Sequence, residues 1–283
     1  MHINREFIHD VVSRFHEYAN LKESDWCNYS KTTPTNANYS DGLYQCFYAL
    51  RFIPAYYFEY CKLASMLNDR LNERKENFIS IASLGFGLAP DYYALTHNLQ
   101  HEFTYTGYDP LLWEQLILMP ETSENFFAHQ SPIEKLPETK IHKHNVFIFP
   151  KSISDINNKN NLAIDQFAKK LATTPHDRIF FLNSFIVNNS SAQSTSIQHF
   201  KKIHLTLINK GFSTQDNPRN TFNIASSSLA LKSINSNFDY PNEKKINCTR
   251  INSTNPNCNT CEVIKNPIFT KNFIDYQLME YQR

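Results

Sequence analysis

Scarcity of glycine is the feature of this sequence that most constrains its fold. The chain of 283 residues has only five glycines, and two of them, Gly85 and Gly87, are separated by one residue. A run typical of a buried strand, residues 78–82, precedes them, and a helix-like run opening with Pro90 follows. A strand, a Gly-x-Gly turn and a helix, with an acid such as Asp109 ending the next strand roughly 20 residues later, is an arrangement that binds nucleotides. The alternative is a tight turn without a ligand, in which Asp109 caps the next helix.

The overall composition excludes several classes of protein. The formal net charge is +1, so no strong basic field indicates a nucleic-acid partner. No apolar run is long enough to span a bilayer, and the first residues do not resemble a signal peptide. The six cysteines are scattered at 27, 46, 61, 248, 258 and 261 and do not form a secreted disulfide framework. We therefore expect a reduced, cytoplasmic protein that is not inserted in a membrane; its oligomeric state is left open.

The order of sequence patterns divides the chain into three parts. Residues 1–75 read as a helical N-terminal subdomain, with a long aromatic helix that we expect to bend at Pro54. Residues 76–232 alternate between strand and helix patterns, which predicts a mostly parallel sheet flanked by helices. The helix candidates are 90–99, 110–118, 162–172 and 194–210. Residues 233–283 read as an irregular C-terminal extension. A loop rich in Asn, Thr and Ser interrupts the helical part at 28–41.

Two late strand candidates, 212–215 and 221–231, leave little room for a crossover helix between them. We therefore expect an antiparallel hairpin at the edge of the sheet. With Lys210, Gly211 and Phe212 leading into the first of these strands, the order of elements resembles class I S-adenosylmethionine-dependent methyltransferases. The resemblance covers residues 76–232 and indicates no subfamily. It implies an α/β fold with a seven-stranded, mostly parallel sheet, helices on both faces, and S-adenosylmethionine as the cofactor.

The same resemblance implies a set of cofactor-binding residues. In that family the glycine turn passes under the methionine part of the cofactor, which corresponds here to Gly85, Phe86 and Gly87. Ala89 stands where the family has a third glycine, so the pattern departs there. The family's second-strand acid binds the ribose hydroxyls, and Asp109 occupies that position.

The ends of the third and fourth strands supply further candidates. By position, His129 and Gln130 would lie along the adenine, although a surface loop explains them equally well. Lys151 and Ser152 follow the fourth strand, where an open sheet places its ligands, and would hold an anionic or carbonyl group of the substrate. The alternative is a strand that ends at Pro150, with a serine capping the next turn.

An aromatic stripe in the N-terminal helical part is the remaining candidate for substrate binding. Arg51, Tyr56 and Tyr57 belong to it, and they would reach the substrate if the helix forms a lid over the crevice. Core packing is the competing interpretation. Cys258 and Cys261 with Cys248 could bind zinc, but no fourth ligand is evident, and free thiols are the simpler interpretation. We predict no metal site.

The favoured function is therefore methyl transfer from S-adenosylmethionine to an unidentified acceptor, with a small molecule favoured over a protein or RNA. No catalytic residue is assigned, because methyl transfer from a sulfonium needs little beyond alignment of the acceptor. A non-catalytic scaffold that retains the fold is the main alternative. A nicotinamide-dependent oxidoreductase is disfavoured by the expected reversed hairpin and by the lack of a hydride-transfer signature.

Overall fold

A computed structural model describes residues 1–21, 38–76, 78–185, 192–216 and 275–283. Its strands are β1 (Phe78–Leu84), β2 (Glu102–Asp109), β3 (Phe126–Gln130), β4 (Val146–Phe149), β5 (Arg178–Phe185) and β6 (Asp275–Gln282). Its α-helices are α1 (Arg5–Leu21), α3 (Gly42–Arg74), α4 (Pro90–Asn98), α5 (Glu138–Ile141), α6 (Ile153–Lys159), α7 (Ala163–Leu171) and α8 (Ala192–Asn209). Two short 3-10 helices are η2 (Glu114–Leu118) and η3 (Ile133–Lys135).

The strands form one mostly parallel sheet in the order β3-β2-β1-β4-β5-β6. β1 lies between β2 and β4 and is parallel to both, while β6 is antiparallel to β5. The chain leaves β1 toward one edge and later returns to β4 on its other side. In such a doubly wound sheet the ligand crevice opens at the carboxyl ends of the strands, where the strand order reverses. By this rule the ends of β1, β2 and β4 lie where a ligand is expected.

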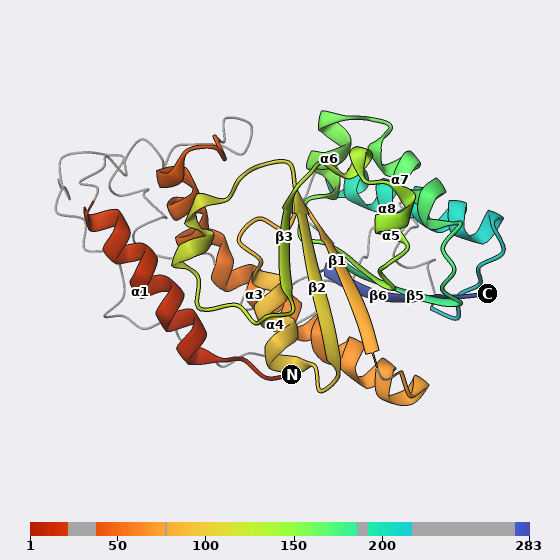
Figure 1. Ribbon diagram of the computed structural model, residues 1–283, viewed down its shortest axis with the longest axis horizontal. Helices are drawn as coiled ribbons and strands as arrows, with labels where there is room; N and C mark the ends of the chain where they lie inside the picture. The colour runs from red at the N-terminus through yellow and green to blue at the C-terminus, as the bar shows by residue number, and fades with distance from the viewer. Residues whose placement is uncertain (22–37, 77, 186–191, 217–274) are drawn as a thin grey trace.

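Helices cover both faces of the sheet (Figure 1). On one face α1, α3 and α4 pack against apolar residues such as Ile81 and Val146. On the other face α5, α6, α7 and α8 cover Phe147, Phe149 and Phe181. Burial on both faces explains why the central strands read as continuous apolar runs rather than alternating ones.

The long helix of the N-terminal part is α3, and its limits follow from local chemistry. Asp41 caps its start, because the carboxylate accepts the N–H of Leu43 at 2.8 Å. Pro54 lies inside the helix, as the sequence predicted, and Lys75 ends it in the left-handed conformation. Most of the α3 residues are buried, because α1 and α4 pack around it on the sheet face.

The reversed strand differs from the sequence-based prediction. The strand antiparallel to β5 is β6 at residues 275–282, which the sequence assigned to an irregular extension; the candidate at 221–231 lies outside the described residues. The described part of the sheet has six strands instead of seven. The predicted strand at 212–215 contributes only an isolated antiparallel bridge between Ser213 and Gln282. Pairing between segments so far apart in sequence cannot be read from local pattern.

The segment after β2 is a second correction. Residues 110–118 were expected to form a helix, but only the short 3-10 helix η2 is present. The buried Gln45 side chain of α3 binds this segment through the Leu112 carbonyl at 3.1 Å and the Gln115 N–H at 3.0 Å. These long-range bonds satisfy backbone groups that an α-helix would otherwise pair internally.

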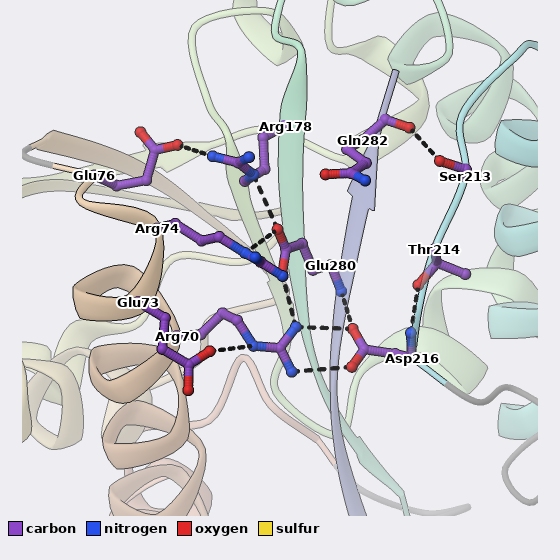
Figure 2. A network of polar contacts seen from close by, with 10 residues as sticks. All are labelled: Arg70, Glu73, Arg74, Glu76, Arg178, Ser213, Thr214, Asp216, Glu280 and Gln282. Atoms are coloured by element: carbon purple, nitrogen blue, oxygen red, sulfur yellow. Dashed lines mark hydrogen bonds and ion pairs between the residues drawn. The ribbon is translucent and has the colours of Figure 1, made fainter.

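A buried ionic network attaches β6 to the N-terminal layer (Figure 2). The Glu280 carboxylate of β6 accepts hydrogen bonds from Arg70 at 2.7 Å and Arg74 at 2.9 Å, and it forms an ion pair with Arg178 at 2.9 Å. Asp216 binds Arg70 through both carboxylate oxygens and accepts the Glu280 N–H at 2.7 Å. One acidic residue of β6 therefore joins α3, β5 and the segment after α8.

Two features are absent from the described ranges. None of the helices there is long and apolar enough to cross a bilayer. No group of three or more His, Cys, Asp or Glu side chains in those ranges is placed to hold a metal ion. Cys248, Cys258 and Cys261, the residues considered for zinc, lie outside the described ranges.

Candidate functional site

The turn after β1 has an unusual backbone. Gly85, Gly87 and Ala89 all adopt the left-handed conformation, with φ of +75°, +57° and +55°. Glycine reaches this region without a steric cost, whereas alanine does so at a cost of about 1–2 kcal/mol. Ala89 thus retains the conformation of a third glycine although the residue differs.

Gly85 and Gly107 allow a close approach by a neighbouring side chain, whereas a Cβ on Gly87 would make only an ordinary contact. A Cβ on Gly85 would lie 2.5 Å from the Cβ of Ser152, and a Cβ on Gly87 would lie 3.4 Å from the Trp113 ring. A Cβ on Gly107 in β2 would lie 2.5 Å from the Phe86 ring. The Phe86 side chain therefore packs on the sheet, and only its backbone belongs to the turn.

Asp109 lies at the end of β2, directly beside the turn. Its carboxylate accepts the N–H of Gly87 at 3.2 Å and the N–H of Leu111 at 2.9 Å, through different oxygens. Burial raises the pKa of Asp109, and these two backbone donors oppose the rise. The Trp113 side chain acts in the same sense as the two backbone donors. A carboxylate has about four lone-pair sites, so it can still accept a further hydrogen bond. Asp109 therefore fits the part of a group that accepts ribose hydroxyls.

Aromatic rings from two other segments border the turn. Trp113, in the segment that Gln45 fixes to α3, packs against the rings of Tyr39 and Tyr48 with centroid separations of 5.8 and 5.4 Å. Gln45 also donates to the Tyr39 carbonyl at 2.8 Å. The sequence reasoning missed Trp113 and Tyr39; the only signal for Trp113 was its position four residues after Asp109.

A buried ion pair lies at the carboxyl ends of β4 and β5. The Lys151 ammonium is 2.6 Å from a Glu59 carboxylate oxygen, and the two side chains are 8% and 5% exposed. The Ser184 hydroxyl of β5 donates to the same oxygen at 2.6 Å. The Lys151 ammonium also lies 5.9 Å from the centroid of the Tyr56 ring. α3, β4 and β5 thus bring their polar groups together at the edge of the sheet where the sequence placed the substrate.

Several other predicted site residues have different surroundings. The Ser152 hydroxyl donates to the Leu84 carbonyl, so Ser152 holds the β4 end on the β1 end. The Arg51 guanidinium lies over the rings of Phe47 and Phe52. Tyr57 does not join the ion pair. Its hydroxyl accepts the N–H of Asn4, just before α1, and bonds to His97 of α4, and its ring contacts Phe7 of α1.

The adenine candidates stand at the end of β3, beside the end of β2. The His129 ring stacks on Tyr108 with centroids 5.5 Å apart. Gln130 pairs in register with Asp109 and is exposed. Their position next to Asp109 agrees with the expected arrangement, while their exposure is also what a surface loop would show.

The left-handed conformation of Ala89 gives a first prediction. We expect Ala89→Gly to change the free energy of unfolding by less than about 1 kcal/mol. Glycine relieves the backbone strain, and this gain offsets the larger conformational entropy that glycine loses on folding and the loss of a buried methyl group. Ala89→Val should destabilise by about 2–4 kcal/mol, because a β-branched residue is strained there and Ala89 is fully buried. Urea unfolding followed by circular dichroism measures both. Equal effects of the two substitutions would contradict the left-handed assignment.

A buried acid lies beneath the turn. Asp91, in the first turn of α4, is fully buried and accepts the Tyr105 hydroxyl at 3.0 Å. Burial raises the pKa of Asp91 to about 6, although the Ser83 and Tyr105 side chains oppose the rise. The folded protein therefore binds the proton of this acid more tightly than the unfolded chain does.

The raised pKa of Asp91 predicts a dependence of stability on pH. Because the folded state binds the proton more tightly, the contribution of Asp91 is greatest below pH 4 and falls as the pH rises to about 6. The loss is up to about 3 kcal/mol. His144 acts in the opposite sense, since burial lowers its pKa to about 4. The measurement is therefore the difference in unfolding free energy between the wild type and Asp91→Asn at several pH values. A difference that stays constant from pH 4 to pH 7 would show that Asp91 keeps an ordinary pKa.

Comparison with known proteins gives structural likeness only. No protein-family model and no curated protein matches the sequence. The plantazolicin methyltransferase is 11% identical with a TM-score of 0.42, covering 80% of this chain and 84% of its own. The 1,6-didemethyltoxoflavin-N1-methyltransferase of Burkholderia thailandensis is 10% identical with a TM-score of 0.40, covering 100% and 91%. An Aquifex aeolicus SAM-dependent methyltransferase is 11% identical with a TM-score of 0.36, covering 55% and 84%.

TM-scores this low carry no argument for the fold, which follows from the strand order alone. The chain has a class I methyltransferase-like fold on its own evidence, namely a doubly wound parallel sheet whose last strand, β6, is reversed. The left-handed turn at residues 85–89 and the acid at the end of β2 complete this description.

Proposed function

We propose that the protein binds S-adenosylmethionine at the carboxyl ends of β1 and β2 and transfers its methyl group to a small-molecule acceptor. The observation that carries this proposal is the left-handed turn from Gly85 to Ala89, whose Gly87 N–H is bonded to the acid at the end of β2. A turn of this kind brings backbone N–H groups to a ligand, and the adjacent acid accepts its ribose hydroxyls. The cofactor supplies an electrophilic methyl group.

In this proposal the residues of the chain have separate tasks. The backbone of Gly85, Phe86 and Gly87 borders the cofactor, Asp109 accepts its ribose hydroxyls, and His129 and Gln130 lie toward its adenine. The acceptor lies on the other side of the turn, near Tyr56, Lys151 and Arg51. Ser152 contributes by fixing the end of β4 against Gly85, where a Cβ would be too close.

Two finer points of the sequence analysis also remain proposals. We infer that the segment around Ser213 occupies the place of a seventh strand, because its one bridge to β6 is antiparallel and lies at the outer edge of the sheet. We also propose the cytoplasm as the location, since Cys46 and Cys61 are buried free thiols, which suit a reducing compartment.

Calorimetry with S-adenosylhomocysteine tests the function. We expect Asp109→Asn to weaken binding about 10-fold to 100-fold, because hydrogen bonds to a charged group contribute about 1.5–3 kcal/mol. Asp165→Asn on α7 is the matched control, since Asp165 pairs with Lys202 away from the turn, and NAD is the control ligand. No binding to the wild type, or equal binding to Asp109→Asn, would reject the proposed site.

One observation favours a second candidate, a scaffold protein that retains the fold without the cofactor. The faces of Gly85 and Gly87 are approached by the chain's own Ser152 and Trp113 side chains. The glycines could therefore serve packing alone. The same calorimetry separates the two candidates, because a scaffold of this kind would bind neither S-adenosylhomocysteine nor NAD.

A further inference from the structure

The ion pair between Lys151 and Glu59 combines two unfavourable features in one place. Both side chains are more than nine-tenths buried, and removing two charges from water costs more than their attraction commonly returns. Lys151 also has φ of +58°, a left-handed conformation that is strained for any residue with a side chain. Features of this kind concentrate at functional sites, because stability alone does not favour them.

The surroundings of the pair fix where each charge points. The Ser184 hydroxyl donates to the same Glu59 oxygen that Lys151 contacts, so that oxygen has two donors. Glu59 lies one turn after Tyr56 on α3, and the Tyr56 ring lies beside the Lys151 ammonium. Lys151 precedes Ser152, whose Cβ is 2.5 Å from the place of a Cβ on Gly85. Polar groups from α3, from β5 and from the segment after β4 thus meet at the ion pair, which adjoins the glycine turn.

The charges of the pair decide which chemical group it suits. Glu59 and Lys151 together are neutral, so an anion would be repelled by Glu59 and a cation by Lys151. A neutral hydroxyl matches both, because it donates to a carboxylate and accepts from an ammonium through one oxygen. The neighbouring wall of rings consists of Tyr48, Phe52 and Tyr56, which repeat every fourth residue on α3 and contact one another. Rings of this kind pack well against a flat aromatic molecule.

We propose that Lys151 and Glu59 form a binding site for the hydroxyl group of a phenol, and that this hydroxyl is the methyl acceptor. The inference rests on the proposed function. Glu59 takes the proton of the O–H bond, which breaks as the oxygen bonds to the methyl carbon, and the electron pair of the C–S bond stays on sulfur. Lys151 stabilises the negative charge that develops on the oxygen.

The test uses the full chain with saturating S-adenosylhomocysteine and three probes. 4-Nitrophenol carries the hydroxyl, nitrobenzene lacks it, and 4-nitrobenzoate replaces it with a carboxylate. We expect 4-nitrophenol to bind at least about tenfold more tightly than either of the others. A site built to bond a hydroxyl leaves its own buried polar groups without that bond when the analogue lacks the hydroxyl, and this weakens binding. Equal affinity for 4-nitrophenol and nitrobenzene, or a preference for 4-nitrobenzoate, would overturn the proposal.

Absorbance of the bound 4-nitrophenol gives a second readout that does not depend on activity. Its ionised form absorbs visible light, so a pH titration measures the pKa of the bound phenol. We expect Lys151→Met to raise that pKa by about one unit or more, because a nearby ammonium favours the phenolate. Lys169→Met on α7 is the matched control, because Lys169 is exposed and is not one of the residues of the proposed hydroxyl site. The same pKa in Lys151→Met and Lys169→Met would overturn the assigned role of Lys151.

The proposal and the proposed function fail in different ways. If S-adenosylhomocysteine binds but the probes are not distinguished, the protein binds the cofactor and its acceptor is not a phenol. If 4-nitrophenol is preferred but S-adenosylhomocysteine does not bind, the hydroxyl site stands and its role in methyl transfer is overturned. If Lys151→Met does not fold, the comparison of the three probes on the wild type still decides the proposal.

Discussion

Glu280→Gln is expected to lower the free energy of unfolding by about 3 kcal/mol, which is among the largest effects of any single substitution in this protein. The carboxylate is 5% exposed, accepts hydrogen bonds from Arg70 and Arg74, and forms an ion pair with Arg178, all at 2.7–2.9 Å. Removing its charge leaves three guanidinium groups close together with less compensation. We place the effect at the lower end for a broken buried pair, because the arginines are 23–34% exposed and so partly solvated.

Glu73→Gln provides the control for this experiment. Glu73 also pairs with Arg70, at 3.8 Å, but its side chain is 68% exposed, so its loss should change stability by less than about 0.5 kcal/mol. Urea unfolding at low and at high salt measures both variants. If both variants lose the same stability, or if neither loses much, β6 is held by its backbone pairing with β5 rather than by the ionic network in Figure 2.

Gly85→Ala is expected to destabilise the protein by about 3 kcal/mol or more. Two causes add, since alanine is strained at φ of +75° by about 1–2 kcal/mol and its Cβ would lie 2.5 Å from that of Ser152. The expected loss arises without any ligand, so thermal unfolding of the protein alone measures it. The proposed function does not enter this prediction.

Two further variants separate the causes. Gly211 has φ of +92° but nothing lies within 4 Å of the place of its Cβ, so Gly211→Ala should cost only the strain, about 1–2 kcal/mol. Adding Ser152→Gly to Gly85→Ala should restore part of the lost stability, although the hydrogen bond to Leu84 is lost as well. If Gly85→Ala and Gly211→Ala cost the same, the contact with Ser152 is not close.

The sequence by itself determined the elements whose causes are local. Alternating strand and helix patterns predicted β1 to β5 and a mostly parallel sheet flanked by helices, because strands and helices that alternate along the chain typically form such a sheet. The glycine spacing predicted a tight turn after β1 and an acid at the end of the next strand, because glycine allows the backbone to turn sharply. Placement of Lys151 at the crevice followed from a general rule for open sheets.

The tertiary structure alone decided the features that depend on distant partners. Pairing of β5 with β6, the packing of Trp113 against the turn, and the contact of Glu59 with Lys151 each join residues with no shared local pattern. The sequence could place Tyr56 and Tyr57 on one helix, but only packing showed that Tyr56 lies beside Lys151 while Tyr57 contacts α1 and α4. Adjacent helix residues point about 100° apart, so which of them faces a site depends on how the whole helix packs on the sheet.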